Sequence, residues 1–413
     1  MAAIGNFIIY IIMGCAVLGV FAYLKDEESP LGKEFIEGLY SIGPIFVPTA
    51  GILASLPYLS VFVKSVCGPF FTALGADPAI AATTIIAVDM GGYQLADVLA
   101  QSREGWIMAM VVGYMSGATI VFSIPVGLTM LKKKDHKYMA LGMMAGLLSI
   151  PIGVFISCSF ISISDLAVRG IISTNVDSAL VLGLSFKSIF LNLLPLTIFC
   201  VSLAVGLKLV PKAMIKGFLF FGRTMSIGLT LVLVFSIVEY FTGVFSAVFG
   251  NWGFDPIIAD EKDQFRALEI AGYIGIMLCG AFPMVYLIKK YLAKPMDIIG
   301  SKVGLESTGS AGILAAAANI LAMFRLIEDM RSKDKVLCIA FSVCAAFTFG
   351  DHLSFTANFQ PNLILPVMSG KLLGGCAGFG LAYLLSVPAA RLLEAEENDK
   401  IETAGAEPAL EGA

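Results

Sequence analysis

The chain has 413 residues and a formal net charge of −4 at pH 7; 58% of the residues are hydrophobic, 14% are charged, and the mean hydropathy is +0.88. Soluble domains carry about 25% charged residues, so this composition excludes a soluble globular protein. Apolar runs recur near the ~20 residues that a helix needs to cross a bilayer, and the ~10-residue alternating segments of a β-barrel are absent. We therefore expect an all-α polytopic membrane protein embedded in a lipid bilayer.

Hydropathy and loop signals predict about eleven membrane-spanning segments. They lie near residues 4–24, 38–64, 79–100, 106–131, 138–162, 178–208, 217–249, 267–291, 305–326, 335–358 and 362–390. The first run has no basic region before it, so we expect a retained helix rather than a cleaved signal. Residues 391–413 are acidic and lack aromatics, which predicts a disordered tail.

The charged loops predict an orientation. Three basic loops are expected to be cytoplasmic, namely residues 132–137, 208–216 and 289–295. The acid-rich loops 25–35 and 254–265 should then face outward. Eleven alternating crossings satisfy these five loops with the N-terminus inside, but they leave the loop 325–335, with four bases against three acids, on the outside.

A weak internal repeat runs through the chain. The stretch 74–90 resembles 303–321, and 117–125 aligns with 345–353. This alignment pairs Asp89 with Asn319, and a further match, "EGLYSIG" with "EIAGYIG", pairs Glu37 with Glu269.

The repeat predicts three units before the tail: a first five-helix repeat over residues 1–165, a linking helix over 166–212 and a second repeat over 213–390. Eleven spans make the repeats parallel. One re-entrant segment would make them inverted, which is the commoner pattern in transporters. The sequence leaves both arrangements open.

Few ionisable residues lie well inside the predicted spans; Asp89, Asp351 and His352 do. A carboxylate at the membrane centre costs roughly 2.5–3.5 kcal/mol on insertion scales, so it needs a partner or water. A polar contact between helices is the alternative explanation, but the glycines beside both acids favour a ligand site.

Gly91 and Gly92 closely follow Asp89, and Gly350 precedes Asp351. Glycine weakens a helix by ~1 kcal/mol relative to alanine. Broken helices are tolerated at membrane depth where they face protein or a water-filled cavity, and they free backbone groups to bind a ligand. We predict two broken helices near the membrane midplane, with Asp89 as the anion for a cation; close helix packing is the alternative for Gly91 and Gly92.

Neighbouring polar residues complete the candidate site. His352 either bonds a carbonyl across helices, or binds a hydroxyl or changes its charge near neutral pH. Thr119 and Ser123 are four residues apart and share one helix face; they either line the site or bond back to preceding carbonyls. Asn319 offers an amide.

Catalytic and metal-binding patterns are missing. The eight cysteines mostly lie in apolar segments without CxxC spacing, as small buried residues do. Two histidines are too few for a metal site, so no metal and no cofactor are expected. No P-loop, GxSxG, HExxH or Rossmann pattern occurs in its expected context. We expect no enzyme and no nucleic-acid partner.

Several motifs point to one family. "DMGG", "TIVFSIPV", "GDHLSF" and "GKLLGG", in this order, resemble the EutH ethanolamine transporters of bacteria, as do "GAFPMV" and the end of "ANILAMF". The similarity covers nearly the whole chain except the tail. The resemblance implies a multi-pass permease of the bacterial inner membrane that takes up ethanolamine as a source of carbon and nitrogen.

By position in the motifs, the resemblance also implies a set of site residues: Asp89, Asp351, His352, Asn319, Glu37 and Glu269. Ethanolamine fits these chemically, because its ammonium needs a carboxylate and its hydroxyl needs a donor or acceptor. We expect alternating access or facilitated diffusion. The alternatives are a channel or permease for ammonium or another small amine, or a non-transporting membrane sensor. A homodimer is expected only because many repeat-built transporters form one.

Overall fold

The computed structural model describes residues 2–406, and the side chains of residues 5–396. Helices dominate, and two short strands, β1 (Ala167–Val168) and β2 (Leu180–Val181), pair antiparallel in one loop. Within the described residues, nine helices are long and apolar enough to cross a membrane. The expectation of an all-α polytopic membrane protein is confirmed, but not the count of eleven spans.

The helices follow in chain order. The first half contains α1 (Ala2–Lys25), α2 (Pro30–Tyr40), α3 (Ile42–Ala54), α4 (Leu56–Phe62), α5 (Gly68–Ala73), α6 (Pro78–Ile85), α7 (Gly92–Leu99), α8 (Arg103–Val112), α9 (Ile124–Met130), α10 (His136–Ser164) and α11 (Phe186–Leu209). The second half contains α12 (Pro211–Thr242), α13 (Val244–Phe249), α14 (Ala267–Lys302), α15 (Ser307–Ala318), α16 (Ile320–Leu326), α17 (Ser332–Ala345), α18 (Asp351–Phe359), α19 (Ile364–Leu385) and α20 (Val387–Ala406). Between α8 and α9 the chain forms a π-helix, Gly113–Ser123.

Side-chain caps and glycines set several helix ends. Ser102 begins α8 by accepting from the Gly105 amide at 2.9 Å, and Ser185 begins α11 in the same way. α12 ends at Gly243, whose φ of +62° is the left-handed conformation that glycine adopts readily.

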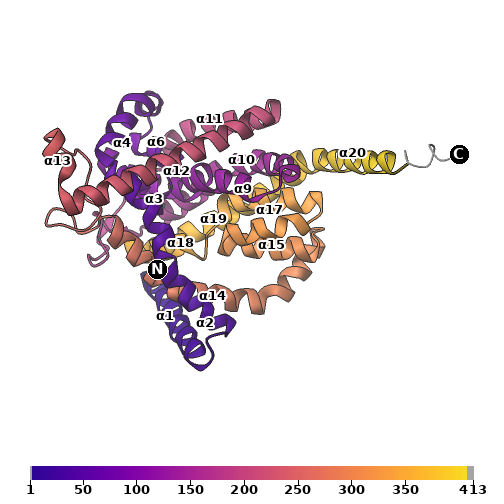
Figure 1. The fold of residues 1–413 in the computed structure, drawn as a ribbon, viewed down its shortest axis with the longest axis horizontal. Helices are drawn as coiled ribbons and strands as arrows, with labels where there is room; N and C mark the ends of the chain where they lie inside the picture. The colour runs from indigo at the N-terminus through magenta and orange to yellow at the C-terminus, as the bar shows by residue number, and fades with distance from the viewer. Residues whose placement is uncertain (1, 407–413) are drawn as a thin grey trace.

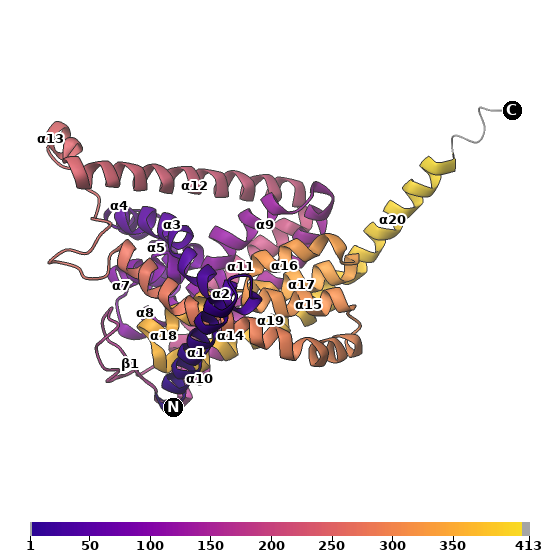
Figure 2. The same ribbon diagram turned by 60° about the horizontal axis from the view of Figure 1, so that its bottom comes forward.

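The centre of the molecule is a bundle in which α10 packs against α11, α17 and α19 (Figure 1). Small residues allow close approach there: a Cβ on Gly374 would lie 2.8 Å from the Gly153 Cα. α12 runs along one edge of this bundle (Figure 2), and most of its residues are exposed, as befits a helix that faces lipid.

Residues 77–101, where a single span had been predicted at 79–100, form a helical hairpin, here the first hairpin. One oxygen of Asp77 caps α6, and the other accepts from the Gln101 amide just after α7, at 3.0 Å. Both ends of the hairpin therefore lie together. The chain reverses because Ile86 and Ala87 are extended and Gly91 is left-handed.

Residues 306–331 form the second hairpin, where a span had been predicted at 305–326. The Asp334 carboxylate accepts from the Glu306 amide at 3.0 Å and from Arg331 Nε at 3.2 Å, which ties the two ends together. The turn falls at Asn319, whose backbone is extended between α15 and α16.

The segments that follow the hairpins run in opposite directions. Asp135, which follows α9, pairs with Lys335 at the start of α17, with an Oδ1–Nζ distance of 2.6 Å. At the opposite end of the segment α17–α18, Arg169 donates to the Asn358 carbonyl of α18. Figure 2 shows α7, α8 and α18 toward the left and α15, α16 and α17 toward the right. The hairpins thus enter from opposite ends.

The two hairpins change which loops lie at the same end of the molecule. An ion pair between Lys132 and Glu328 puts the loop 325–335 beside the basic loop 132–137, which removes the conflict in the predicted orientation. α1 starts just after the end of α18, where Gly5 packs on the Pro361 backbone. Because α1 runs from there toward the other end of the molecule, the loop 25–35 lies at the same end as the basic loops, and not opposite them as predicted. The other acidic loop, 254–265, lies at the opposite end, with the ring of Phe265 5.9 Å from that of Phe359.

The expected disordered tail, residues 391–413, is only partly described. α20 continues through it to Ala406, in a stretch rich in alanine, leucine and glutamate, which are strong helix formers. Residues 407–413 lie outside the described residues.

Candidate functional site

Asp89 lies at the tip of the first hairpin. Helix α6 ends at Ile85, Val88–Met90 form a single 3₁₀ turn, and α7 starts at Gly92. We refer to residues 86–91 as the first break. Gly91 has a φ of +96°, and a Cβ there would lie only 2.8 Å from Ile52 Cγ2, so both its backbone conformation and its packing require glycine.

The first break rests on the π-helical stretch Gly113–Ser123. Ser116 Oγ donates to the Thr84 carbonyl at 2.6 Å, near the end of α6. Gly117 faces the Ile86 carbonyl so closely that no Cβ would fit. A π-helix shifts hydrogen bonds to i+5 and is frequent at functional sites.

The second break, residues 346–350, separates α17 from α18. Its backbone lies against the tip of the second hairpin, where the Phe347 and Phe349 amides donate to the Ala316 and Ala317 carbonyls at 3.3 and 2.9 Å. Asp351 and His352 then open α18. The tip of each hairpin therefore packs against an irregular part of the segment that follows it.

The two breaks bring Asp89, Asp351 and His352 together. His352 Nε2 lies 4.0 Å from Asp89 Oδ1, and the Asp351 carboxylate interacts electrostatically with Asp89. The Asp89 side chain is only 13% exposed, and within the described chain its Oδ1 has no hydrogen-bond partner. A buried carboxylate oxygen without a hydrogen-bond partner is suited to bind a cation.

Other unpartnered polar groups lie close to these residues in the sequence. Among the described residues, His352 Nδ1, Ser354 Oγ and both polar atoms of the Gln94 amide lack hydrogen-bond partners. The His352 ring packs edge-on against Tyr114, with centroids 4.9 Å apart, and Tyr114 shares a 2.5 Å hydrogen bond with Thr356. Tyr114 therefore gives His352 an aromatic neighbour, and the polar atoms without partners lie close to Asp89 and His352 along the chain.

Thr119, Ser123 and Asn319 are occupied by backbone groups. The single hydroxyl proton of Thr119 is shared between the Met115 carbonyl at 2.7 Å and the Val343 carbonyl at 2.9 Å, and Ser123 Oγ donates to the Ala118 carbonyl at 3.2 Å. This is the back-bonding alternative. Asn319 Oδ1 accepts from the Leu321 amide at 2.9 Å and caps α16.

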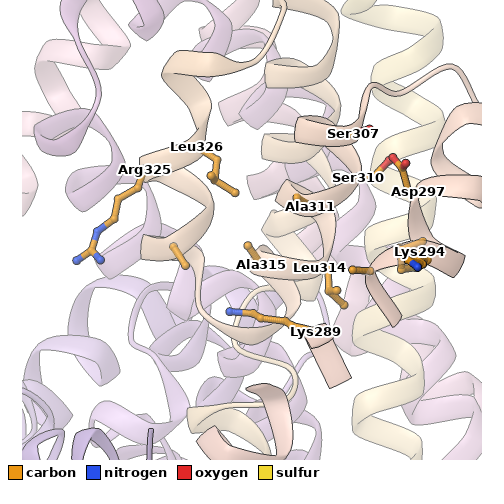
Figure 3. Close-up of a pocket in the computed structure, with 13 residues that line it drawn as sticks. Lys289, Lys294, Asp297, Ser307, Ser310, Ala311, Leu314, Ala315, Arg325 and Leu326 are labelled. Atoms are coloured by element: carbon orange, nitrogen blue, oxygen red, sulfur yellow. The ribbon is translucent and has the colours of Figure 1, made fainter. Parts of the chain in front are cut away.

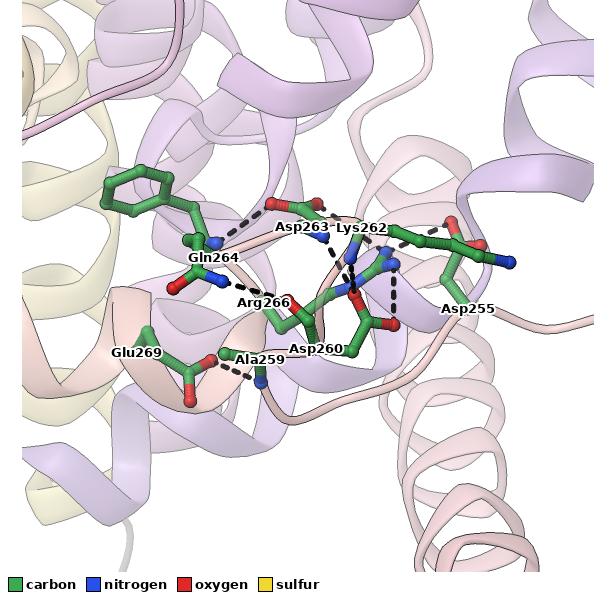
Figure 4. A network of polar contacts seen from close by, with 9 residues as sticks. Asp255, Ala259, Asp260, Lys262, Asp263, Gln264, Arg266 and Glu269 are labelled. Carbon is green, nitrogen blue, oxygen red and sulfur yellow. Dashed lines mark hydrogen bonds and ion pairs between the residues drawn. The ribbon is translucent and has the colours of Figure 1, made fainter.

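Glu37 and Glu269 lie apart from the two breaks. Glu37 is exposed on α2. Glu269, in the first turn of α14, accepts from the Ala259 amide at 3.0 Å, beside the acidic network around Arg266 (Figure 4). Both acids therefore have surroundings different from those of Asp89.

Sequence reasoning missed Lys371. It belongs to the "GKLLGG" motif inside the predicted span 362–390, and the structure buries it completely on α19. Its ammonium donates to the carbonyls of Cys344 at 2.7 Å and Tyr114 at 3.0 Å, and it interacts electrostatically with Asp89. A lone lysine in an apolar span was the available signal.

A cavity of about 620 Å³ lies elsewhere, between α14 and the second hairpin (Figure 3). Its charged lining consists of Lys289, Lys294, Arg325 and Asp297. Three bases against one acid do not suit an organic cation. The breaks, rather than this cavity, provide the candidate cation site.

The apolar helices and the charged helix breaks define a multi-pass membrane protein with a polar site buried among its helices. The chain belongs to the family described as "Ethanolamine utilisation protein, EutH", which matches residues 4–385. No solved structure matches it.

Three relatives illustrate the family. The chain is 34% identical to a probable ethanolamine permease EutH of Listeria monocytogenes, over 98% of this chain and 100% of that protein. It is 35% identical to the probable ethanolamine permease EutH of Escherichia coli, over 86% and 85%. The uncharacterized protein YxeR of Bacillus subtilis is 31% identical over 90% and 92%.

Proposed function

We propose that this protein transports ethanolamine, as the ammonium cation, across the bacterial inner membrane. The observation that carries the proposal is the buried Asp89 carboxylate, which lies 4.0 Å from His352, interacts electrostatically with Asp351 and has one oxygen without a hydrogen-bond partner in the described chain. The relatives named as probable ethanolamine permeases support the substrate.

The ammonium binds between Asp89 and Asp351, and the hydroxyl bonds to His352. Burying one cation against an acid avoids leaving either charge unpaired. Moving one positive charge inward gains ~2.3 kcal/mol per 100 mV. At ~1.4 kcal/mol per tenfold concentration ratio, this supports an accumulation of a few tens-fold without a coupling ion.

The transport cycle uses two inverted repeats, residues 1–165 and 213–390, joined by 166–212. The hairpins enter from opposite ends, and α8–α9 runs antiparallel to α17–α18, which supports inversion. The site at the two breaks is then exposed to each side in turn, near the midplane, with the basic loops in the cytoplasm. A homodimer remains an expectation.

Uptake of labelled ethanolamine into proteoliposomes, against protein-free liposomes, tests the function. The assay is run at mildly acidic pH, where the freely permeant neutral amine is scarce. We expect saturable uptake that grows with an inside-negative potential, and counterflow of labelled substrate, which a channel does not show. Flux equal to that of protein-free liposomes, with folded protein, would refute the proposal.

Cysteine labelling tests the inverted arrangement. In a variant with Cys376 replaced by serine, single cysteines at Glu27, Lys133 and Asn251 are labelled with an impermeant maleimide in oriented vesicles. We expect Glu27→Cys and Lys133→Cys to react from one side and Asn251→Cys from the other. Eleven alternating spans would instead put Glu27 with Asn251.

A further inference from the structure

The last four carbonyls of α17 have no partner within their own helix, because the helix stops at the second break. Each is satisfied differently. The Ser342 carbonyl accepts from the Ala346 amide at 2.9 Å, and the Ala345 carbonyl accepts from Thr348 Oγ1 at 2.7 Å. These two bonds are local.

The remaining two carbonyls of α17 bond to other elements. Val343 accepts from Thr119 in the π-helical stretch, and Cys344 accepts from the Lys371 ammonium on α19. The same ammonium also donates a hydrogen bond to the carbonyl of Tyr114, which belongs to that π-helical stretch. Lys371 therefore joins an interrupted helix to a π-helix by binding one carbonyl from each.

α19 holds the lysine firmly in this position. A Cβ on Gly375 would lie 2.7 Å from Ala345 Cβ and 2.9 Å from the Phe341 carbonyl, so the helix lies directly on α17. Lys371 itself is fully buried, and within the described residues no carboxylate forms an ion pair with it. Its charge acts on Asp89 through space instead.

Backbone carbonyls freed by unwound helices are what transporters commonly use to bind a coupling Na⁺ or H⁺ near the substrate. Here a covalently attached ammonium occupies that kind of place. We propose that Lys371 is a built-in cation that joins the two carbonyl-bearing segments and supplies the positive charge that an inorganic coupling ion would otherwise bring.

The charges support this assignment, which rests on the proposed function. With Asp89 and Asp351 ionised and Lys371 protonated, the cluster carries a formal charge of −1. One substrate ammonium brings it to zero. A tethered cation does not leave during the cycle, so transport follows the substrate gradient and the membrane potential without Na⁺.

Two variants of Lys371 separate its charge from its volume. Lys371→Met keeps most of the volume and removes the cation, whereas Lys371→Ala leaves a space in which propylammonium replaces the missing side-chain end. Lys216→Met, at an exposed site on α12, is the matched control. Each purified protein is assayed for uptake in sodium and tetramethylammonium buffers, and for thermal unfolding with and without propylammonium or Na⁺.

We expect wild-type uptake to be equal in sodium and tetramethylammonium, and uptake by folded Lys371→Met to fall at least tenfold in tetramethylammonium. Propylammonium or Na⁺ should raise the unfolding temperature of Lys371→Ala by several degrees more than that of wild type or Lys371→Met, in which propylammonium can act only through the substrate site. Lys371→Met that transports normally in tetramethylammonium would overturn the proposal, as would wild-type uptake that requires Na⁺.

The two proposals fail separately. The thermal measurement contains no ethanolamine, so it tests the cation site even if wild-type protein transports nothing. If wild type takes up ethanolamine and neither cation stabilises Lys371→Ala more than wild type, only the role of Lys371 is refuted. If Lys371→Met does not fold, the sodium dependence of wild type and the Lys371→Ala measurement still decide.

Discussion

His352 Nε2 lies 4.0 Å from Asp89 Oδ1, although one residue opens α18 and the other lies at the tip of the first hairpin. This distance is too long for a hydrogen bond, and the Asp89 oxygen has no other hydrogen-bond partner in the described chain, so it remains available to a third group. A carboxylate oxygen beside an imidazole suits a short molecule with an ammonium at one end and a hydroxyl at the other.

Neutralising either acid should abolish uptake. Asp89→Asn and Asp351→Asn keep the side-chain shape but remove the charge that pairs with the ammonium. Losing one partner of a buried ion pair costs about 3–5 kcal/mol, so we expect a loss of roughly a hundredfold or more in uptake rate at low substrate concentration.

The control for these variants is Asp165→Asn. Asp165 is exposed, and its φ of +44° is one that asparagine also tolerates. All three proteins should elute as folded species, and only the control should transport. Normal uptake by folded Asp89→Asn or Asp351→Asn would remove that carboxylate from the binding site.

Replacing His352 should change the preference for a hydroxyl group. His352→Phe removes both ring nitrogens, and one neutral hydrogen bond is worth about 1 kcal/mol, or roughly fivefold in affinity. We expect wild type to prefer ethanolamine over ethylamine in competition, and His352→Phe to lose most of this preference. The measured quantity is the ratio of the two inhibition constants.

If His352 had only a structural role, His352→Phe would weaken the binding of ethanolamine and ethylamine equally, and the ratio of their inhibition constants would stay unchanged. The other histidine provides the control, because His136 lies at the start of α10, where its ring contacts the Leu131 carbonyl. His136→Gln should keep the wild-type ratio.

The sequence signals for the breaks were local, which is why they could be predicted. Asp89 with two following glycines, and Gly350 with Asp351, mark the interruptions directly. The hairpins could not be predicted in the same way, since residues 79–100 have the hydropathy of a span. The bond between Asp77 and Gln101 that holds the ends of the first hairpin together is not registered by hydropathy.

The surroundings of the polar residues required the three-dimensional structure. Lys371 bonds to carbonyls of Tyr114 and Cys344, both distant in the sequence, and backbone carbonyls leave no trace in residue type. Thr119 and Ser123 show a second limit of prediction from sequence. Their spacing predicted a shared face, but could not tell whether their hydroxyls were free or bonded to carbonyls.

Alanine at two glycines should shift stability in opposite directions. Gly91→Ala puts a Cβ at a φ of +96° and against Ile52, and the left-handed conformation alone costs about 1–2 kcal/mol. Gly217→Ala lies in α12 with no atom within 4 Å of the new Cβ, and helical alanine gains about 0.5–1 kcal/mol. Thermal unfolding in detergent should show a lower midpoint for Gly91→Ala and an equal or higher one for Gly217→Ala. A Gly91→Ala protein as stable as wild type would show that the first break does not need the left-handed residue.

The loop before α14 should loosen in acid because of Asp260. Its carboxylate accepts from the Asp263 and Lys262 amides at 2.8 and 3.0 Å and contacts Arg266 at 3.3 Å (Figure 4). The bond from the Asp263 amide, with help from Arg266, holds the pKa of Asp260 below its ordinary value. A lowered folded pKa gives stability that is present above the unfolded value and is lost as pH falls through the folded one.

Nearby Asp255 acts in the opposite sense, because burial raises its pKa and its contribution is lost as pH rises. The variant Asp260→Asn separates the contribution of Asp260 from that of Asp255. Limited proteolysis of the loop should accelerate in wild type as pH falls below about 4, the ordinary aspartate range. In Asp260→Asn the loop should already be cut faster at neutral pH and should lose this acid dependence, whereas the exposed neighbour variant Glu261→Gln should behave as wild type. If Asp260→Asn kept the same acceleration in acid, another carboxylate would control the acid response of the loop.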